Sequence, residues 1–240
     1  MFKNYVVTAI RNLLRNKIFA IINIGGLALA LAASILIMLF VRYETGFENW
    51  LKDSSSIYRI ETEMHFPGRE PMEFSYSPGP MKGLLEKEFP GEIAATTWMR
   101  NERTGVAFGD RRFIERVSYV NSTFFEVFDL QAISGAREGG LQDTSSILIS
   151  ERMAEKYFGN KNPVGQILVL DNQLSVRVAG VFENIPDNSH LVLDFLMRLD
   201  PVNYKNSPWV LERWGSVNLF TYFRLREKEG LAPPALARAS

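Results

Sequence analysis

The pattern of apolar and polar positions divides the chain into two unequal parts. An uncharged run covers residues 18–41, and from Arg42 onward short apolar segments alternate with charged and turn-forming residues. At about 1.5 Å per helical residue the run reaches roughly 36 Å, which is enough to cross a hydrocarbon layer of about 30 Å. The segment from Ile18 to Val41 therefore predicts one transmembrane helix.

A cleaved signal peptide is the alternative interpretation of an apolar run near the N-terminus. Its apolar region has about 7–15 residues and ends in a small-residue cleavage site. Here the small residues Ala28, Ala30, Ala32 and Ala33 lie in the middle of the run, and the sequence ILIMLFV follows them. The pattern therefore favours an uncleaved helix.

Residues 1–17 predict a cytoplasmic, basic, amphipathic helix. They contain four basic residues, Lys3, Arg11, Arg15 and Lys17, and no acidic residue. Cytoplasmic flanks of membrane helices are enriched in Lys and Arg, so we expect this end inside the cell and the residues after 41 outside it. Apolar residues recur at helical spacing, at Phe2, Val6, Ile10, Leu13 and Leu14. Such a helix can anchor the span at the membrane surface or contact a cytoplasmic partner, and the sequence leaves both roles open.

Residues 42–226 predict a mixed extracytoplasmic domain, so the fold class is α+β with one N-terminal transmembrane helix. Strand-like and helix-like segments alternate, which favours mostly antiparallel neighbours in more than one lobe. We expect strands at 57–64, 93–99, 105–108, 112–120, 146–149, 166–170, 174–182, 191–199 and 217–225. We expect helices at 81–89, 122–128 and 151–158.

The helix expected at 151–158 has the clearest end signals. Ser150 is a good N-cap, Glu151 lies in the first turn, Lys156 in the last, and Gly159 stops the helix. The turn that follows is expected to set the domain geometry, and ordinary helix termination by glycine and proline is favoured over a contact site there. Its residues are Phe158, Gly159, Asn162, Pro163 and Gly165.

Residues 227–240 form a tail rich in Gly, Ala and Pro. No second apolar run of membrane-spanning length occurs before the last residue. We therefore expect either a single-pass anchor or the front part of a longer protein, with the tail as an apparent truncation point.

Composition narrows the possible functions. After the four basic residues of the N-terminal flank are set aside, 23 basic and 27 acidic residues remain, a formal charge of −4. This balance argues against nucleic acid as a partner.

The chain has no cysteine, which excludes disulfides and thiolate-bound metals, and it has no GxxxxGK[ST] loop for ATP. Its two histidines, His65 and His190, lack a nearby metal-binding partner in the sequence. We expect no cofactor, no metal and no catalytic residue, and hence no enzyme.

Several segments, taken in order, resemble MacB-type (FtsX-like) ABC transporter permeases. The first is the apolar helix with its flank, residues 9–41. The others are Tyr58-Arg59-Ile60, residues 120–128 (VNSTFFEVF), 149–159 (ISERMAEKYFG), 162–165 (NPVG), 180–182 (GVF), Ile185-Pro186, 188–190 (NSH), Trp214 and Thr221-Tyr222. Together they are similar to the family's first membrane helix and periplasmic core domain.

The resemblance implies a permease subunit in the cell inner membrane that works with a separate cytoplasmic ATPase. Complete family members have three further C-terminal helices, which this sequence lacks, and such permeases form homodimers or heterodimers. The implied function is efflux or mechanotransmission, with ATP hydrolysis by the partner subunit. A single-pass tethered binding or sensing domain that acts without an ATPase is the alternative. A membrane-anchored enzyme would need a polar constellation around His65 or His190.

Overall fold

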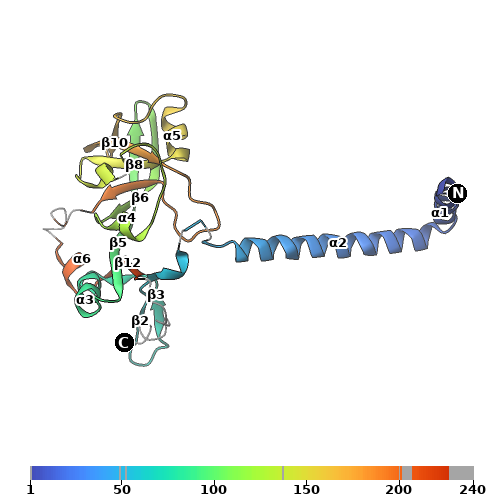
Figure 1. Cartoon of the computed structure of the whole chain (residues 1–240), viewed down its shortest axis with the longest axis horizontal. Helices are drawn as coiled ribbons and strands as arrows, with labels where there is room; N and C mark the ends of the chain where they lie inside the picture. The colour runs from blue at the N-terminus through green and yellow to red at the C-terminus, as the bar shows by residue number, and fades with distance from the viewer. Residues whose placement is uncertain are drawn as a thin grey trace. The chain divides into compact units, whose positions relative to one another are not determined.

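The computed structural model describes residues 2–48, 50–51, 53–136, 138–199, 201 and 207–226 (Figure 1). The tail expected at 227–240 lies outside the described residues. The chain forms two compact units, Met1–Glu48 and Asn49–Ser240.

The first unit consists of two helices, α1 (Phe2–Arg15) and α2 (Lys17–Thr45). The break falls at Asn16, whose φ of −113° and ψ of 56° are not helical. Both helices were predicted, and the amphipathic segment is separate from the long helix. Within the described residues, α2 is the one helix whose length and composition suit a membrane crossing, with a mean hydropathy of 2.6. None of its residues is buried in the protein.

The described residues of the second unit form twelve strands and several short helices. The strands are β1 (Ile57–Arg59), β2 (Thr62–Met64), β3 (Met72–Phe74), β4 (Ser77–Pro78), β5 (Ile93–Phe108), β6 (Arg111–Val120), β7 (Ala132–Gly135), β8 (Ser146–Ser150), β9 (Ile167–Leu170), β10 (Leu174–Phe182), β11 (Phe195–Arg198) and β12 (Val217–Leu225). The helices are α3 (Met81–Glu88), α4 (Phe124–Val127), α5 (Glu151–Phe158) and α6 (Trp209–Glu212), with 3-10 turns η1 (Ser54–Ser56) and η2 (Glu138–Leu141).

Six strands close into a barrel. β5 pairs with β6, β6 with β11, β11 with β8, β8 with β10, β10 with β9, and β9 returns to β5. Two of these pairings, β6 with β11 and β8 with β10, are parallel and the other four are antiparallel. The apolar interior includes Val106, Val117, Ile149, Val176 and Phe195, and α5 adds Met153, Tyr157 and Phe158 to the same cluster. Because closure leaves few free strand edges, the barrel forms a self-contained lobe.

A second lobe is built on the first half of β5. There β12 pairs antiparallel with β5, and β1 and β4 pair with β12. Helix α4 contributes Phe124 and Val127 to the larger core of this region, and Leu85 of α3 packs in a smaller cluster with Ile93 and Phe223. The expected lobes are therefore present, joined by one continuous sheet.

Most predicted elements are confirmed, and the differences have physical causes. The segment expected as one strand at 57–64 is two strands, because the chain leaves the main sheet after β1 to form the hairpin β2–β3. The strands expected at 93–99 and 105–108 are one, β5, because the polar and charged residues 100–103 between them also pair with β6. The strand expected at 191–199 is shorter, Phe195–Arg198.

Candidate functional site

The residues predicted at the membrane lie on the first unit. Ile18 and Val41 belong to α2 and are 74% and 50% exposed. Arg11 and Arg15 are exposed on α1, and Lys17 is the first residue of α2. Lys3 belongs to α1, but its side chain lies outside the described part of the structure. The unit thus presents a basic helix next to a long helix whose apolar side chains face outward.

The predicted turn after α5 leads the chain from the helix into the barrel strand β9. Gly159 ends the helix with a φ of 61°, and its N–H donates to the Glu155 carbonyl at 2.9 Å. Asn162 Oδ1 accepts from Val164 N at 3.1 Å, which tightens the following bend. Gly165 has a φ of 86°, and its N–H donates to the Val178 carbonyl at 2.8 Å. Both glycines occupy the left-handed region that other residues rarely adopt.

Phe158 and Pro163 complete the same turn. Phe158 is 5% exposed and packs on Phe108, with ring centroids 4.5 Å apart. The Pro163 carbonyl accepts from Gln166 N at 3.0 Å. All five predicted turn residues therefore fix how α5 joins the barrel.

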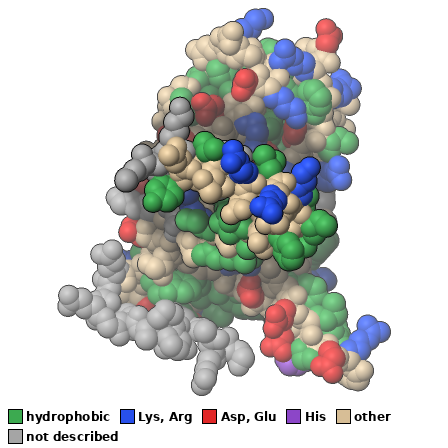
Figure 2. All heavy atoms as spheres, turned by 90° about the vertical axis from the view of Figure 1, so that its right-hand side faces the viewer, with side chains coloured by type: hydrophobic (Ala, Val, Ile, Leu, Met, Phe, Trp, Pro, Cys, Tyr) green, Lys and Arg blue, Asp and Glu red, His purple; other side chains and the backbone are tan. Residues whose placement is uncertain are grey.

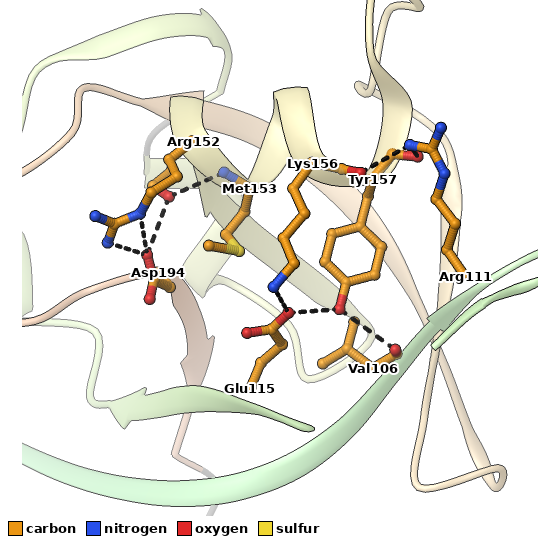
Figure 3. A network of polar contacts seen from close by, with 9 residues as sticks. Val106, Arg111, Glu115, Arg152, Met153, Lys156, Tyr157 and Asp194 are labelled. Carbon is orange, nitrogen blue, oxygen red and sulfur yellow. Dashed lines mark hydrogen bonds and ion pairs between the residues drawn. The ribbon is translucent and has the colours of Figure 1, made fainter. Parts of the chain in front are cut away.

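A polar network ties α5 to the barrel, and Glu115 is its centre (Figure 3). Glu115 is on β6 at an inward-facing position and is only 9% exposed. Its Oε1 accepts from Lys156 Nζ at 2.7 Å and from the Tyr157 hydroxyl at 2.8 Å. Arg111, from the start of the same strand, donates to the carbonyls of Lys156 and Tyr157 at 2.7 and 2.8 Å. The arginine thereby satisfies carbonyls at the helix C-terminus that have no partner within the helix.

The N-terminus of α5 is held by Asp194, which lies just before β11. Ser150 Oγ accepts from Met153 N at 3.3 Å, as an N-cap does. Asp194 Oδ1 accepts from Arg152 Nη2 at 2.6 Å and Nε at 3.2 Å (Figure 3). This hydrogen bond raises the pKa of Arg152 above its usual value, which burial only partly offsets. Both ends of α5 are therefore fastened to barrel strands by charged side chains.

Burial raises the pKa of Tyr157, and the hydrogen bond to the Glu115 carboxylate raises it further. The folded protein therefore favours the neutral phenol, whose unfolded pKa is about 10. This stabilisation is complete below pH 10 and is lost as the pH rises through the folded-state value. We expect the free energy of unfolding to fall above pH 10 by up to about 1.4 kcal/mol per pH unit from this group.

The matched variant is Tyr157→Phe, which removes the titrating hydroxyl but keeps the ring. The difference in unfolding free energy between wild type and variant, measured by urea unfolding at several pH values, should shrink above pH 10. A constant difference from pH 8 to pH 11 would show that Tyr157 does not control this dependence.

The polar network holds α5 against the neighbouring strands. Its charged atoms face one another, and each side chain links α5 to a neighbouring strand. Within the described residues, no group of three or more His, Asp and Glu side chains is arranged to hold a metal ion. The contacts of this network therefore serve to hold α5 in position.

A comparison with known protein families shows which family the chain belongs to. Residues 20–232 match the model of the MacB-like periplasmic core domain. The chain belongs to this family. MacB-like domains of this kind occur in permeases of ABC-type transporters, so the resemblance inferred from the sequence is confirmed. A comparison with curated protein sequences gave no significant match.

Solved structures agree with the assignment of a MacB-like domain. A crystallised domain of a protein described as a permease, from Porphyromonas gingivalis, is similar with a TM-score of 0.65 and 25% identity over 78% of each chain. The periplasmic region of MacB from Actinobacillus actinomycetemcomitans shares the fold, with a TM-score of 0.52 and 16% identity. That match covers 77% of this chain and 80% of the other.

The two histidines of this MacB-like domain lie on separate elements. His65 directly follows β2, and its Nε2 lies 3.2 Å from Glu63 Oε1. His190 lies in the loop before β11, with its Nε2 3.0 Å from the Tyr222 hydroxyl. The described contacts join His65 to a surface carboxylate and His190 to a core tyrosine. These contacts do not bring the two histidines together in one polar site.

Sequence reasoning missed the residues that hold α5 in the MacB-like domain, above all Glu115, Arg111 and Asp194. One signal was available for Glu115, because in a strand it lies on the same side as the apolar residues Phe113 and Val117 and opposite to Arg112 and Arg116. A carboxylate at an inward-facing position needs a charged or hydrogen-bonding partner. The identity of that partner depends on long-range pairing, which spacing alone does not specify.

Proposed function

We propose that this chain is a permease subunit of an ABC-type efflux or mechanotransmission complex. In this proposal residues 1–17 are cytoplasmic, 18–41 cross the inner membrane, and 42–226 form the periplasmic domain. A separate cytoplasmic ATPase binds the basic end and supplies the energy. The subunit works as a homodimer or as a permease heterodimer.

One observation carries the proposal: a long exposed apolar helix precedes a MacB-like periplasmic domain in the same chain. Every residue of α2 from Ile18 to Val41 is uncharged, and none is buried in the protein. Water does not stabilise such a surface, whereas lipid does. A continuous helix of 29 residues can pass a displacement from one side of a bilayer to the other.

The residues of the proposed mechanism have distinct roles. Arg11 and Arg15 on α1, together with Lys3 and Lys17, would contact the ATPase or the anionic inner surface of the membrane. The turn from Phe158 to Gly165 would keep the barrel lobe in a fixed geometry while the domain moves. Any cargo would be recognised by the periplasmic domain.

The topology can be tested by cysteine labelling, because the natural chain has no cysteine. We expect Arg69→Cys, on the exposed turn of the hairpin β2–β3, to react with a membrane-impermeant maleimide in intact cells whose outer membrane has been made permeable. Asn12→Cys, on α1, should react only after the inner membrane is opened. The reverse pattern would contradict the proposed orientation.

The ATPase partner can be tested by purifying the tagged full chain from membranes in mild detergent. We expect an ABC-type ATPase to co-purify. The yield should fall at least about tenfold in the triple variant Arg11→Glu, Arg15→Glu, Lys17→Glu if labelling shows that its topology is retained, because the charge reversal replaces attraction with repulsion. Absence of any ATPase from repeated purifications would favour the tethered domain that acts alone.

A further inference from the structure

The barrel lobe has an exposed sheet face with three arginines, which we call the arginine face and define as Arg103, Arg112, Ile114 and Arg116. Arg103 on β5 lies directly opposite Arg116 on β6, and Arg112 is four residues from Arg116 on the same face of β6. All three arginines are exposed, and Ile114 between the two β6 arginines is 67% exposed. The face thus combines positive charge with an apolar centre.

The arginine face is electrostatically unfavourable by itself. Like charges that lie directly opposite in an antiparallel pair destabilise a sheet. In the described part of the chain, the side chains of Arg103, Arg112 and Arg116 form no hydrogen bond or ion pair within the molecule. Asp171 lies beside the face, but its Oδ1 accepts from Gly105 N at 2.7 Å. An anionic partner would remove the repulsion between the arginines.

The same unit carries a surface of opposite charge on the hairpin β2–β3, defined here as residues 61–74 and called the acidic hairpin. Its four glutamates and one arginine give a formal charge of −3 with His65 neutral. Glu63 lies directly opposite Glu73, so this pair also repels. The hairpin is a separate two-stranded sheet, and Phe66 and Met72 on it are 42% and 47% exposed.

The two surfaces lie at opposite ends of the unit. Figure 1 shows the hairpin projecting at the bottom, while the barrel strands with α5 are at the top. Figure 2 shows acidic side chains over the projection at the lower right, and Lys and Arg side chains interspersed with some acidic ones over the top. This separation prevents the acidic hairpin from reaching the arginine face of its own chain.

We propose that the acidic hairpin of one copy docks on the arginine face of a second copy of this chain. The match of charge identifies the occupant: a repelling pair of glutamates meets a repelling pair of arginines, and exposed apolar residues accompany both. The residues after 41 have a net charge of −4, which disfavours an anionic lipid surface as the occupant. Two copies related by a two-fold axis can make the contact twice, with the acidic hairpin of each on the arginine face of the other. It goes beyond the proposed coupling to an ATPase and does not depend on it.

Crosslinking of the full-length chain in membranes tests this contact. One tagged copy carries Ile114→Cys, which leaves all three arginines in place, and a differently tagged copy carries Arg69→Cys, which leaves all four glutamates. We expect a short bis-maleimide to join the two tags. The mixed product should exceed the product that joins two copies with the same cysteine, because the contact is between unlike surfaces.

Charge reversal supplies the control. Arg103→Glu with Arg116→Glu should lower the mixed product at least about tenfold, and Glu63→Arg with Glu73→Arg on the other copy should restore it. Lys87→Glu with Arg213→Glu is the matched control, because both residues are exposed elsewhere on the unit. This pair of substitutions should leave the yield of the mixed product unchanged. High salt should weaken the native product.

Four results would overturn the proposal. Three of them are no mixed product, a mixed product that is insensitive to reversal at Arg103 and Arg116, and a prevalence of same-cysteine products. A fourth is that the full chain forms no mixed product and that its arginines instead mediate contact with added vesicles containing phosphatidylglycerol, which would make lipid the occupant. Each result is independent of whether an ATPase co-purifies.

Discussion

Replacing Phe195 by alanine is expected to destabilise the second unit by about 3–5 kcal/mol. Phe195 of β11 is fully buried in the barrel interior, and its ring meets that of Tyr157 edge-on with centroids 5.9 Å apart. Truncation removes these contacts and leaves a cavity that a closed ring of strands cannot readily collapse. Since a domain of this kind has a total stability of about 5–15 kcal/mol, the loss is a large part of the whole.

Tryptophan fluorescence during urea unfolding in detergent provides the measurement. All four tryptophans, Trp50, Trp98, Trp209 and Trp214, follow α2, so the signal reports on the second unit alone. Phe66→Ala on the acidic hairpin is the matched control, because that ring is already 42% exposed and its loss should cost far less. Equal midpoints for the two variants would show that the barrel is not the stabilising core.

Replacing Glu115 by alanine is expected to cost about 3 kcal/mol, since it removes the shared acceptor of two buried or half-buried donors. Lys156 would lose its ion pair, and the hydroxyl of Tyr157, a side chain only 1% exposed, would lose its acceptor. The Lys156 side chain is 36% exposed and can still reach water, which keeps the cost at the low end of the range for broken buried pairs.

Two variants distinguish this effect from a general loss of charge. Glu115→Gln keeps an acceptor for the Tyr157 hydroxyl and should cost about 1–2 kcal/mol. Glu88→Ala breaks a surface pair, in which Glu88 Oε1 lies 3.7 Å from Lys87 Nζ and is half exposed, and should stay within about 0.5 kcal/mol of wild type. If Glu115→Ala behaves like Glu88→Ala in the same unfolding measurement, the network does not stabilise α5.

Local signals were sufficient to predict elements whose limits are set by neighbours in sequence. Helix α5 is the clearest case, because Ser150 and Gly159 act within one turn of the helix ends. The hairpin of β9 and β10 was also predicted from its turn, and Asp171 and Asn172 indeed have positive φ values of 48° and 59°. In both cases the chemistry that decides the structure lies within a few residues.

Elements that depend on distant pairing were predicted less well. Separate strands were expected at 93–99 and 105–108, but pairing with β6 keeps the residues between them in one strand of 16 residues. Closure of the barrel depends on the pairing of Val106 with Leu170, 64 positions apart, which no local pattern shows. The network around Glu115 was missed for the same reason, since its donors come from residues about 40 positions away.

The length of β5 has a mechanical consequence. The strand contributes its first half to the sheet with β12 and its second half to the barrel, with β6 pairing along its whole second part. A hinge between the lobes would have to break the ladder of backbone hydrogen bonds that crosses this point. Relative motion of the two lobes is therefore disfavoured along β5, and bending of the domain has to occur in the segments outside this strand.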